Sequence, residues 1–505
     1  MKLSVLAILP SLVLGIKLPA PAIRDGGNST SLGKCEGAKY LHKHRLFVLT
    51  DIDNEPDDQM SLVRLLTYSN EIDIRGITAT TSQWLKNTTG AETIHKVITA
   101  YENATENLNA NVPADGRYPT AAALLSKVSS GHPVFGLAAL ELELSEGAQA
   151  LIRAIDEASP KDPLWVTIWG GANVLAEALY SVSKTRNVDE VAAFISNLRV
   201  YSISDQDDAG PWIRTQYPSL FYIASIHGYN LYSMATWAGI SGETEYHFDQ
   251  GGPDSSLVTN DWLQTHVRIG HLGKFYPNFA YIMEGDTPSF FPLIQNGLNY
   301  PEEPSWGGWG GRYTLVDSSG TKLLYSNAAD QVQGLNGDTF VSPFASIWRW
   351  RQHYQYDFAA RMQWAASGDY SANNHPPVAI VNGTCGPDPW IVSFSSGTSV
   401  ILDASDSWDP DNEELSFQWL YYQEPTLHPF HPFSIESPFV NITNVDELGM
   451  TVEVQLNVDL LASSAQAMGS SERDFHVILM VSDKRDLSLT SYRRIVLVPS
   501  ETAKV

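Results

Sequence analysis

Apolar and polar positions divide the chain into two parts of different character. RLFVLTDID (45–53) and EIDIRGITATT (71–81) are apolar runs that predict buried strands, and the helical spacing of MSLVRLLTY (60–68) predicts a helix between them. The same order recurs, with a strand in 162–171, a helix in 173–182 and a strand in 198–204. Strands that alternate with helices in this way predict one large α/β domain, over residues 44–372, with an open and mostly parallel sheet.

The second part of the chain follows a polar linker at 367–377, SGDYSANNHPP. Beyond it, apolar and polar residues alternate around an Asp-rich turn in 400–422, and VEVQLNV, FHVILMVSD and RRIVLVPS follow as further candidate strands. This alternation predicts an all-β sandwich of immunoglobulin-like type over residues 377–500.

The N-terminus has the pattern of a secretory leader. Lys2 precedes the apolar run 3–16, and small residues end at Ala20, so we expect a signal peptide over 1–20 and an N-terminal arm over 21–43. Five N-x-S/T sequons, which begin at Asn28, Asn87, Asn103, Asn382 and Asn441, fit a secreted glycoprotein. No later apolar run is long enough to span a membrane. Two cysteines, Cys35 and Cys385, are either a single bridge or unpaired thiols, and an extracellular location favours the bridge.

Composition and motifs exclude several classes of function. The formal net charge is −25, so phosphate backbones would be repelled and nucleic acid is not an expected partner. The sequence has no HExxH zinc motif, no GxSxG nucleophile elbow and no GxxxxGK[ST] phosphate loop.

The stretch that carries chemistry is DIDNEPDD, at the end of the first predicted strand. It holds five carboxylates within eight residues, Asp51 to Asp58. Ligands of open α/β sheets bind beyond the carboxyl ends of the strands, and Ca²⁺ prefers six to eight oxygen ligands. The cluster therefore predicts a calcium site. The alternative is a solvated acidic turn whose Asp57 and Asp58 favour the positive end of the next helix.

Several segments together resemble one family. DIDNEPDD is similar to the DxDPGxDD signature of the calcium-dependent nucleoside hydrolases, GITATTSQW (76–84) to their second strand, and TIWGGANVLAEAL (167–179) to their GPLTN-type turn and helix. The resemblance is closer to a secreted branch of cellulose-binding proteins with a nucleoside hydrolase-like domain. Its segments correspond to residues 50–64, 201–214 and 284–291, and a C-terminal sandwich completes it.

The resemblance implies roles for individual residues. It makes Asp53 the general base and a calcium ligand, and Asp57 a carboxylate that supports catalysis. It makes Asp58, the main-chain carbonyl of Trp169 and Asp286 further ligands of Ca²⁺. Around them, the expected substrate contacts are Asp51, Glu55, Gln83, Trp84, Asn173, Asp207, Asp208, Trp212, Arg214 and Glu284.

Three departures from the family pattern affect the expected substrate, and one is that the ribose-contacting asparagine of the second strand is replaced around Ser82 and Gln83. Asn54 and Glu55 replace a Pro-Gly pair, and Glu55 either reaches the substrate or pairs with an arginine such as Arg214. Gly285 stands where the hydrolases carry a leaving-group histidine, so Glu284 or Asp207 is the expected replacement acid. Trp84, Trp306 and Trp309 lie in loops, where each either stacks on a sugar or packs in the core.

The leading hypothesis is a secreted, calcium-dependent hydrolase of glycosyl bonds. Its expected substrate is a furanosyl-type glycoside from plant cell-wall material, or a nucleoside-like compound. The alternatives are a non-catalytic protein that binds cellulose or another carbohydrate, and a structural extracellular protein.

Overall fold

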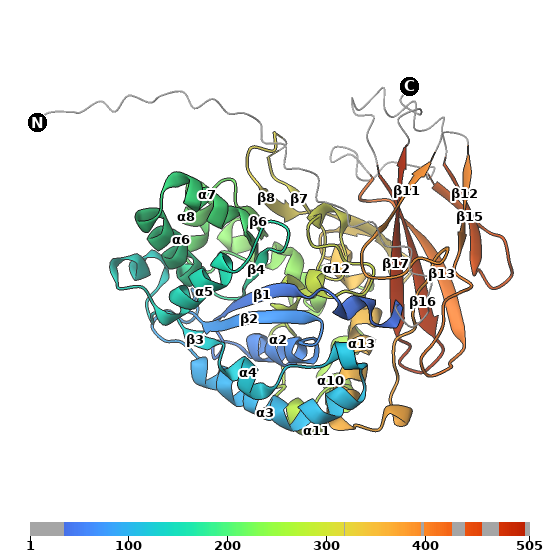
Figure 1. The fold of residues 1–505 in the computed structure, drawn as a ribbon, viewed down its shortest axis with the longest axis horizontal. Coiled ribbons are helices and arrows are strands. Elements are labelled where there is room, and N and C mark those ends of the chain that lie inside the picture. The colour runs from blue at the N-terminus through green and yellow to red at the C-terminus, as the bar shows by residue number, and fades with distance from the viewer. Residues whose placement is uncertain (1–34, 318, 395–397, 427–439, 457–473, 500–505) are drawn as a thin grey trace, which may run out of the picture.

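The computed structural model describes residues 35–317, 319–394, 398–426, 440–456 and 474–499. The expected signal peptide and most of the expected arm, with the sequon at Asn28, lie outside these residues. Figure 1 shows an α/β domain in blue to light orange, beside an all-β domain in orange to red. The expected fold, a mostly parallel α/β sheet followed by a β-sandwich, is confirmed.

The α/β domain is built on one eight-stranded sheet, with the order β3-β2-β1-β4-β5-β6-β8-β7. Neighbouring strands are parallel except for β7 and β8, which pair antiparallel at one edge. The strands are β1 (His44–Thr50), β2 (Ile72–Ala79), β3 (Val128–Ser130), β4 (Leu164–Ile168), β5 (Leu198–Ser202), β6 (Phe221–Ala224), β7 (Tyr313–Leu315) and β8 (Leu324–Asn327).

Both faces of this sheet are buried, which explains the continuous apolar runs of its central strands. In β1, Leu46 and Val48 point into one apolar cluster, and Phe47 and Leu49 point into the other. The first cluster includes residues of α2 (Pro56–Thr67), α3 (Ala91–Ala110), α4 (Ala121–Leu125) and α13 (Arg351–Ala366). The second includes residues of α5 (Glu146–Asp156), α6 (Asn173–Thr185), α7 (Val188–Ser196) and α8 (Ala209–Gln216).

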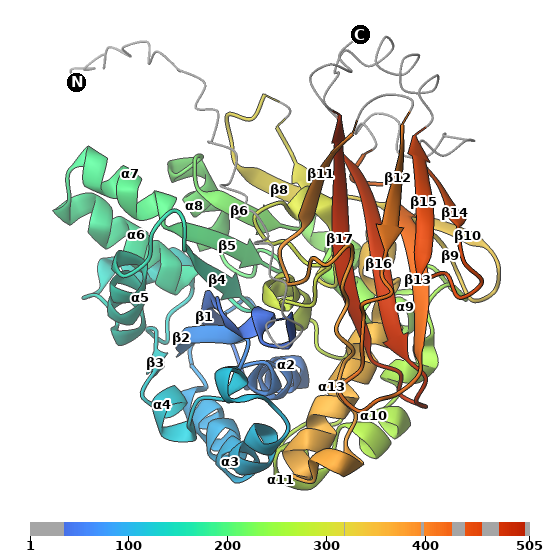
Figure 2. The same cartoon turned by 45° about the vertical axis from the view of Figure 1, so that its right-hand side comes forward.

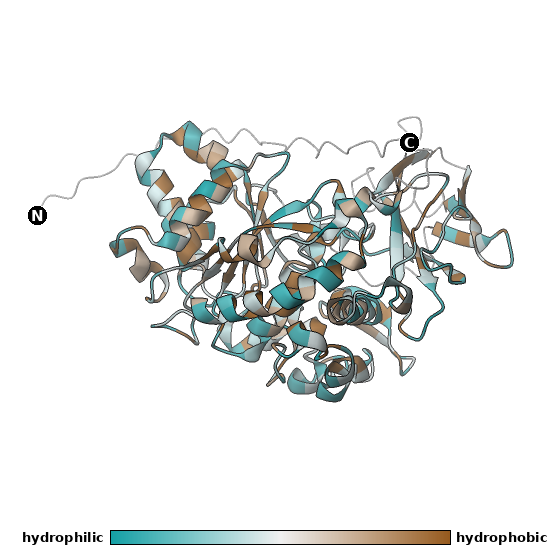
Figure 3. Cartoon of the chain, turned by 60° about the horizontal axis from the view of Figure 1, so that its bottom comes forward, coloured by the Kyte–Doolittle hydropathy of each residue, from teal (hydrophilic) through white to brown (hydrophobic). Residues whose placement is uncertain are grey.

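The helices carry hydrophilic and hydrophobic stripes, as expected of helices with one side on the sheet (Figure 3). Shorter helices complete the domain: α9 (Glu243–Tyr246), α10 (Asn260–His266), α11 (Gly270–Gly273) and α12 (Ala345–Trp348). A separate hairpin is formed by β9 (Asp330–Gln333) and β10 (Thr339–Ser342). In the part of the chain that is described, no helix has both the length and the apolar character needed to cross a bilayer.

The C-terminal domain packs a four-stranded sheet, β11-β17-β16-β13, against a three-stranded sheet, β12-β15-β14. Its strands are β11 (Trp390–Phe394), β12 (Ser399–Asp403), β13 (Leu415–Tyr422), β14 (Val440–Asn444), β15 (Thr451–Leu456), β16 (Phe475–Asp483) and β17 (Thr490–Pro499). The immunoglobulin-like type of this sandwich and the exact domain boundaries remain predictions.

Figure 2 shows the sandwich beside α13, and the two domains meet there in a buried contact. Trp350, just before α13, packs against Tyr422 and Tyr492 of the sandwich, with ring centroids 5.9 Å apart in each pair. Buried Asp330 binds Arg312 at 2.6 Å and Arg349 at 2.9 Å and accepts a hydrogen bond from Tyr422 at 2.7 Å. Cys35 and Cys385 form the expected disulfide, which ties the N-terminal segment to the second domain.

Candidate metal centre

The centre is built where β1 ends and α2 begins. Asp51 follows the last residue of β1 and is 2% exposed. Helix α2 starts at Pro56, which suits the first position of a helix because proline lacks an N–H group. Asp57 and Asp58 therefore lie in the first turn of α2, where the helix dipole favours negative charge. The Thr50 hydroxyl donates a hydrogen bond to Asp58 and fixes its orientation.

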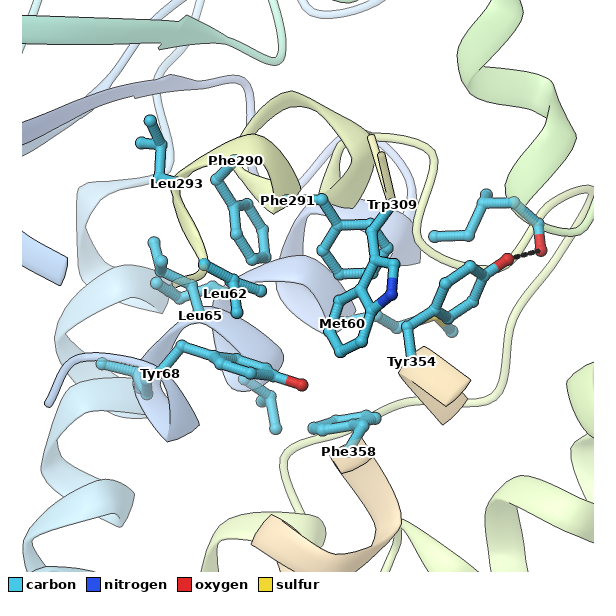
Figure 4. Packing of buried hydrophobic residues seen from close by; sticks show 14 of the residues in the cluster. Met60, Leu62, Leu65, Tyr68, Phe290, Phe291, Leu293, Trp309, Tyr354 and Phe358 are labelled. Atoms are coloured by element: carbon cyan, nitrogen blue, oxygen red, sulfur yellow. Dashed lines mark hydrogen bonds between the residues drawn. The ribbon is translucent and has the colours of Figure 1, made fainter. Parts of the chain in front are cut away.

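Asp286 reaches this turn from more than 200 residues further along the chain. The segments that follow it, η7 (Thr287–Ser289) and η8 (Phe291–Leu293), lie against α2. Figure 4 shows Phe290 and Phe291 beside Met60, Leu62 and Leu65 of that helix. Polar contacts add to this packing: Thr287 hydrogen-bonds Ser61 at 3.0 Å, and the Trp169 indole donates to Ser289 at 2.9 Å.

As a result, three carboxylates share one small space. One oxygen each of Asp57, Asp58 and Asp286 lies within 4.8 Å of the others. Asp58 and Asp286 are 3% and 1% exposed, and Asp57 is half-buried. We call these residues the aspartate triad.

Burial and mutual repulsion disfavour the charged forms of these acids. Burial, followed by the charges of Glu55 and Asp51, raises the pKa of Asp57 to about 7. Burial, then the neighbouring aspartates, also raises the pKa values of Asp58 and Asp286. Burial raises the pKa of Asp51 to about 6, although a hydrogen bond with Ser82 lowers it. A divalent cation would remove this conflict by compensating the negative charge.

Unpaired oxygen atoms support the same interpretation. Asp51 Oδ2 and Asp286 Oδ2 are buried and have no hydrogen-bond partner. Buried polar atoms without partners are uncommon in native proteins, and a bound ion can supply the contact that such atoms lack. The candidate metal ligands are all carboxylate oxygens, which suit a hard cation such as calcium. The aspartate triad therefore fits a bound metal ion.

Two consecutive glycines allow the strand ends to approach one another closely. A Cβ atom on Gly170 would lie 2.6 Å from Asp51 Oδ1, and one on Gly171 would lie 2.5 Å from Asp207 Oδ2. Asp207 is 8% exposed, its Oδ2 has no partner, and burial raises its pKa to about 7. Asn173 donates to Thr81 at 3.2 Å, and its buried Oδ1 also has no partner. Asp207 and Asn173 thus keep unpaired acceptors for which a ligand could supply donors.

Asp53, the expected base and calcium ligand, lies outside the aspartate triad. It is exposed, with a φ of 89° that residues other than glycine rarely adopt. Its carboxylate faces Gly90, the residue before α3, where an ideal Cβ would lie 2.6 Å from Asp53 Oδ2. Its negative charge is therefore placed near the positive end of the α3 dipole.

Glu284, the expected replacement acid, is fully buried and occupied by protein donors. It binds Arg64 through Nε at 2.5 Å and through Nη2 at 3.1 Å. It also accepts hydrogen bonds from Tyr276 and from Thr287. Its φ of 55° belongs to the left-handed region. This geometry gives Glu284 a structural role beneath Asp286.

Four further expected contacts have protein partners. Arg214 forms a two-pronged salt bridge with Asp205, at 2.7 and 2.6 Å, and not with Glu55. Asp208 accepts a hydrogen bond from the Leu137 N–H, and the Trp169 carbonyl accepts one from Gln206. Trp212 packs at the edge of the second apolar cluster, with ring centroids 6.4 Å from Tyr180 and 5.9 Å from Tyr217.

The loop tryptophans divide into two groups. Trp309 is 1% exposed and donates to Tyr492, and Trp306 packs against Tyr300 and His476, so both have packing roles. Trp84 is 51% exposed, and Gln83 beside it is partly exposed.

Two aromatic residues beside the triad could not be anticipated from any motif. The charges of Asp286, Asp51 and Asp57 help to raise the pKa of Tyr232, after burial, which indicates that its hydroxyl is close to them. The Trp237 ring fills the space at Gly285: a Cβ there would lie 3.1 Å from Trp237 Cζ3 and 2.8 Å from Asp57 Oδ2. A side chain at position 285 would therefore require Asp57 and Trp237 to shift.

Comparison with known proteins identifies the family. Residues 45–313 match the profile described as cellulose-binding Sde182, nucleoside hydrolase-like domain. Residues 399–499 match that of the cellulose-binding protein Sde0182, C-terminal domain. The chain belongs to the Sde182 family. The expected resemblance to cellulose-binding proteins with a nucleoside hydrolase-like domain is thereby confirmed.

A similar solved structure supports the assignment. The chain is 32% identical to a nucleoside hydrolase-related hypothetical protein from Saccharophagus degradans that is associated with carbohydrate metabolism, with a TM-score of 0.71. The match covers 91% of this chain and 100% of that one. An endo-fucoidan hydrolase of glycoside hydrolase family 107 is 11% identical to this chain, and the match covers 94% of this chain and 69% of the hydrolase. Its TM-score of 0.17 is too low to indicate a shared fold. No curated protein is significantly similar.

Proposed function

We propose that this Sde182-family protein is a secreted, calcium-dependent hydrolase of glycosyl bonds. Its substrate would be a furanosyl-type glycoside, with plant cell-wall material as the source. The observation that carries the proposal is the aspartate triad, with its unpaired Asp286 oxygen, at the carboxyl ends of parallel strands. The disulfide supports secretion, because such bonds persist in oxidising compartments.

Asp57, Asp58 and Asp286 would hold the ion, and Asp51 would complete the negative surroundings. When bound there, Ca²⁺ would supply a more acidic water molecule and an anchor for vicinal sugar hydroxyls. The four aspartates would stabilise the positive charge that develops on a sugar ring as its C1 bond breaks.

Asp57 is the base that the geometry favours. It is the least buried residue of the aspartate triad, so it is the member nearest to the solvent from which water and substrate arrive. Asp53 was expected from the family resemblance, but its carboxylate points to Gly90. Asp207 and Asn173 retain free acceptor atoms that suit sugar hydroxyls.

The experiment compares hydrolysis of inosine, uridine and 4-nitrophenyl furanosides with calcium and after EDTA treatment. We expect cleavage of a furanoside that EDTA abolishes, and a loss of about 10²–10⁴-fold in Asp58→Asn and Asp57→Asn. Asp115→Asn, at an exposed site in η2 (Ala114–Gly116), is the matched control and should retain full activity. Cleavage that survives both EDTA and Asp58→Asn would refute the calcium-dependent mechanism.

A second candidate is a carbohydrate-binding protein without catalysis. Gly285 favours it, because the chain lacks a histidine at the position that protonates the leaving group in nucleoside hydrolases. Exposed Trp84 also suits a binding surface. This candidate would hold if the calcium-loaded protein bound glycans and cleaved none of the substrates above.

A further inference from the structure

An exposed aromatic surface lies next to the aspartate triad. Trp84 comes from the loop after β2, and Tyr229 and Tyr232 come from η4 (Tyr229–Met234), after β6. Their ring centroids are 6.2 to 6.4 Å apart in all three pairs. We call Trp84, Tyr229 and Tyr232 the aromatic platform.

Two members of the aromatic platform are exposed, and Tyr232 is half-buried. Trp84 and Tyr229 are 51% and 54% exposed, and no other tryptophan among the described residues is as exposed as Trp84. Leu231 and Met234 of the same segment are 50% and 45% exposed. Large apolar side chains that gather on a surface commonly mark a binding site.

The platform is continuous with the candidate metal centre. Tyr232 is 5.5 Å, between ring centroids, from Trp237, whose ring borders Asp57 across Gly285. On the other side, the Ser82 hydroxyl accepts hydrogen bonds from the N–H groups of Trp84 and Leu85 and also contacts Asp51. Aromatic rings thus lead from solvent to the aspartates.

Charge restricts what such a surface can bind. The triad, Asp51 and Glu55 make the inner end strongly acidic, and the whole chain carries a net charge of −25. An anionic glycan would be repelled, whereas a neutral sugar offers C–H faces to the rings and hydroxyl donors to the carboxylates.

We propose that the aromatic platform binds a neutral oligosaccharide, whose terminal residue extends into the aspartate triad. The contact with the triad rests on the proposed function, but stacking on Trp84 and Tyr229 needs neither the metal nor catalysis. The substrate would then be the end of a glycan chain, with Trp84 as the outermost contact.

The test measures binding of the full chain to cellohexaose and to arabinohexaose by titration calorimetry, with polygalacturonate as the anionic comparison. We expect one neutral hexaose to bind, Trp84→Ala and Tyr229→Ala each to weaken it by about tenfold, and Trp84→Phe to retain most of the affinity. Tyr370→Ala is the matched control, because Tyr370 is 40% exposed. Tyr370 also packs on His375, whose ring contacts Asn111. Asn111 follows the C-terminal end of α3, whereas the candidate metal centre lies near the N-terminal end of that helix.

The outcomes separate this proposal from the hydrolase. Hexaose binding that depends on Trp84 and persists in Asp58→Asn supports the platform, even if no substrate is cleaved. The platform is refuted if no neutral hexaose binds, if Trp84→Ala binds like wild type, or if polygalacturonate binds more tightly. The proposal is also refuted if light scattering shows that Trp84→Ala converts a dimer to a monomer while hexaose binding is unchanged, because the platform would then be a dimer interface. Calcium-dependent cleavage of aryl furanosides would still stand in each of these cases.

Discussion

Asp286→Asn distinguishes a metal site from an ordinary buried polar cluster. The change keeps the shape of the side chain and removes one charge. Ligand oxygens of the triad lie within 4.8 Å of one another. Two negative charges at this separation repel by about 3.5 kcal/mol at an effective dielectric constant of ~20. Protons relieve part of the repulsion, because the pKa of Asp57 is raised to about 7. Retaining such a proton at pH 8 costs about 1.4 kcal/mol.

We therefore expect calcium-free Asp286→Asn to be more stable than wild type by about 1–3 kcal/mol at pH 8. With calcium at 1,000 times its dissociation constant, wild type should gain about 4 kcal/mol, and the variant should lose most of this gain. Urea unfolding followed by tryptophan fluorescence, in EDTA and in calcium, measures both quantities, with Asp115→Asn as the control. The reasoning would be refuted if the variant were less stable without calcium and responded to calcium like wild type.

Three further predictions follow from the same contacts. In the calcium-free protein, folded-state pKa values of about 6 for Asp51 and about 7 for Asp57 lie above the ordinary value of 3.8, so the folded state binds more protons than the unfolded state. The contribution of these two groups to the free energy of unfolding should be largest below pH 4 and should fall from pH 4 to 7. Calcium should reverse this fall. A free energy of unfolding that stays constant between pH 4 and 7 would contradict the prediction. Glu284→Gln should lower the free energy of unfolding in urea by about 3–5 kcal/mol, because it leaves the buried Arg64 without its charged partner. A stable variant that had lost only activity would instead make Glu284 an acid of the reaction. Replacing Cys35 and Cys385 by serine should cost about 2–5 kcal/mol, measured by urea unfolding in non-reducing buffer, and an unchanged midpoint would exclude a stabilising role for the bridge.

The fold was largely predictable because its signals are local. Apolar runs marked β1, β2, β4 and β5, and period-two alternation marked the sandwich. The predicted start of α2 is less accurate, because the helical spacing of apolar residues begins at Met60, whereas the helix begins at Pro56. Hydrophobic spacing does not reveal a first turn made of proline and acids, yet that turn carries Asp57 and Asp58.

The site was predictable only in part, because its contacts are distant in the sequence. The acidic motif and the family resemblance indicated Asp58 and Asp286, which the structure brings together. Neither could indicate that Glu284 is bound by Arg64, since the two are 220 residues apart. The aromatic neighbours Tyr232 and Trp237 follow β6 in a segment without a motif, and only the folded chain brings them to the aspartates.

The central claim is that the aspartate triad binds one divalent cation. Equilibrium dialysis of the full chain against ⁴⁵Ca²⁺ at pH 7.5 tests it directly. We expect one calcium ion per chain in wild type and in Asp115→Asn, and none at the same free calcium concentration in Asp58→Asn. Wild type that binds no calcium, or an Asp58→Asn variant that binds as much as wild type, would contradict the claim.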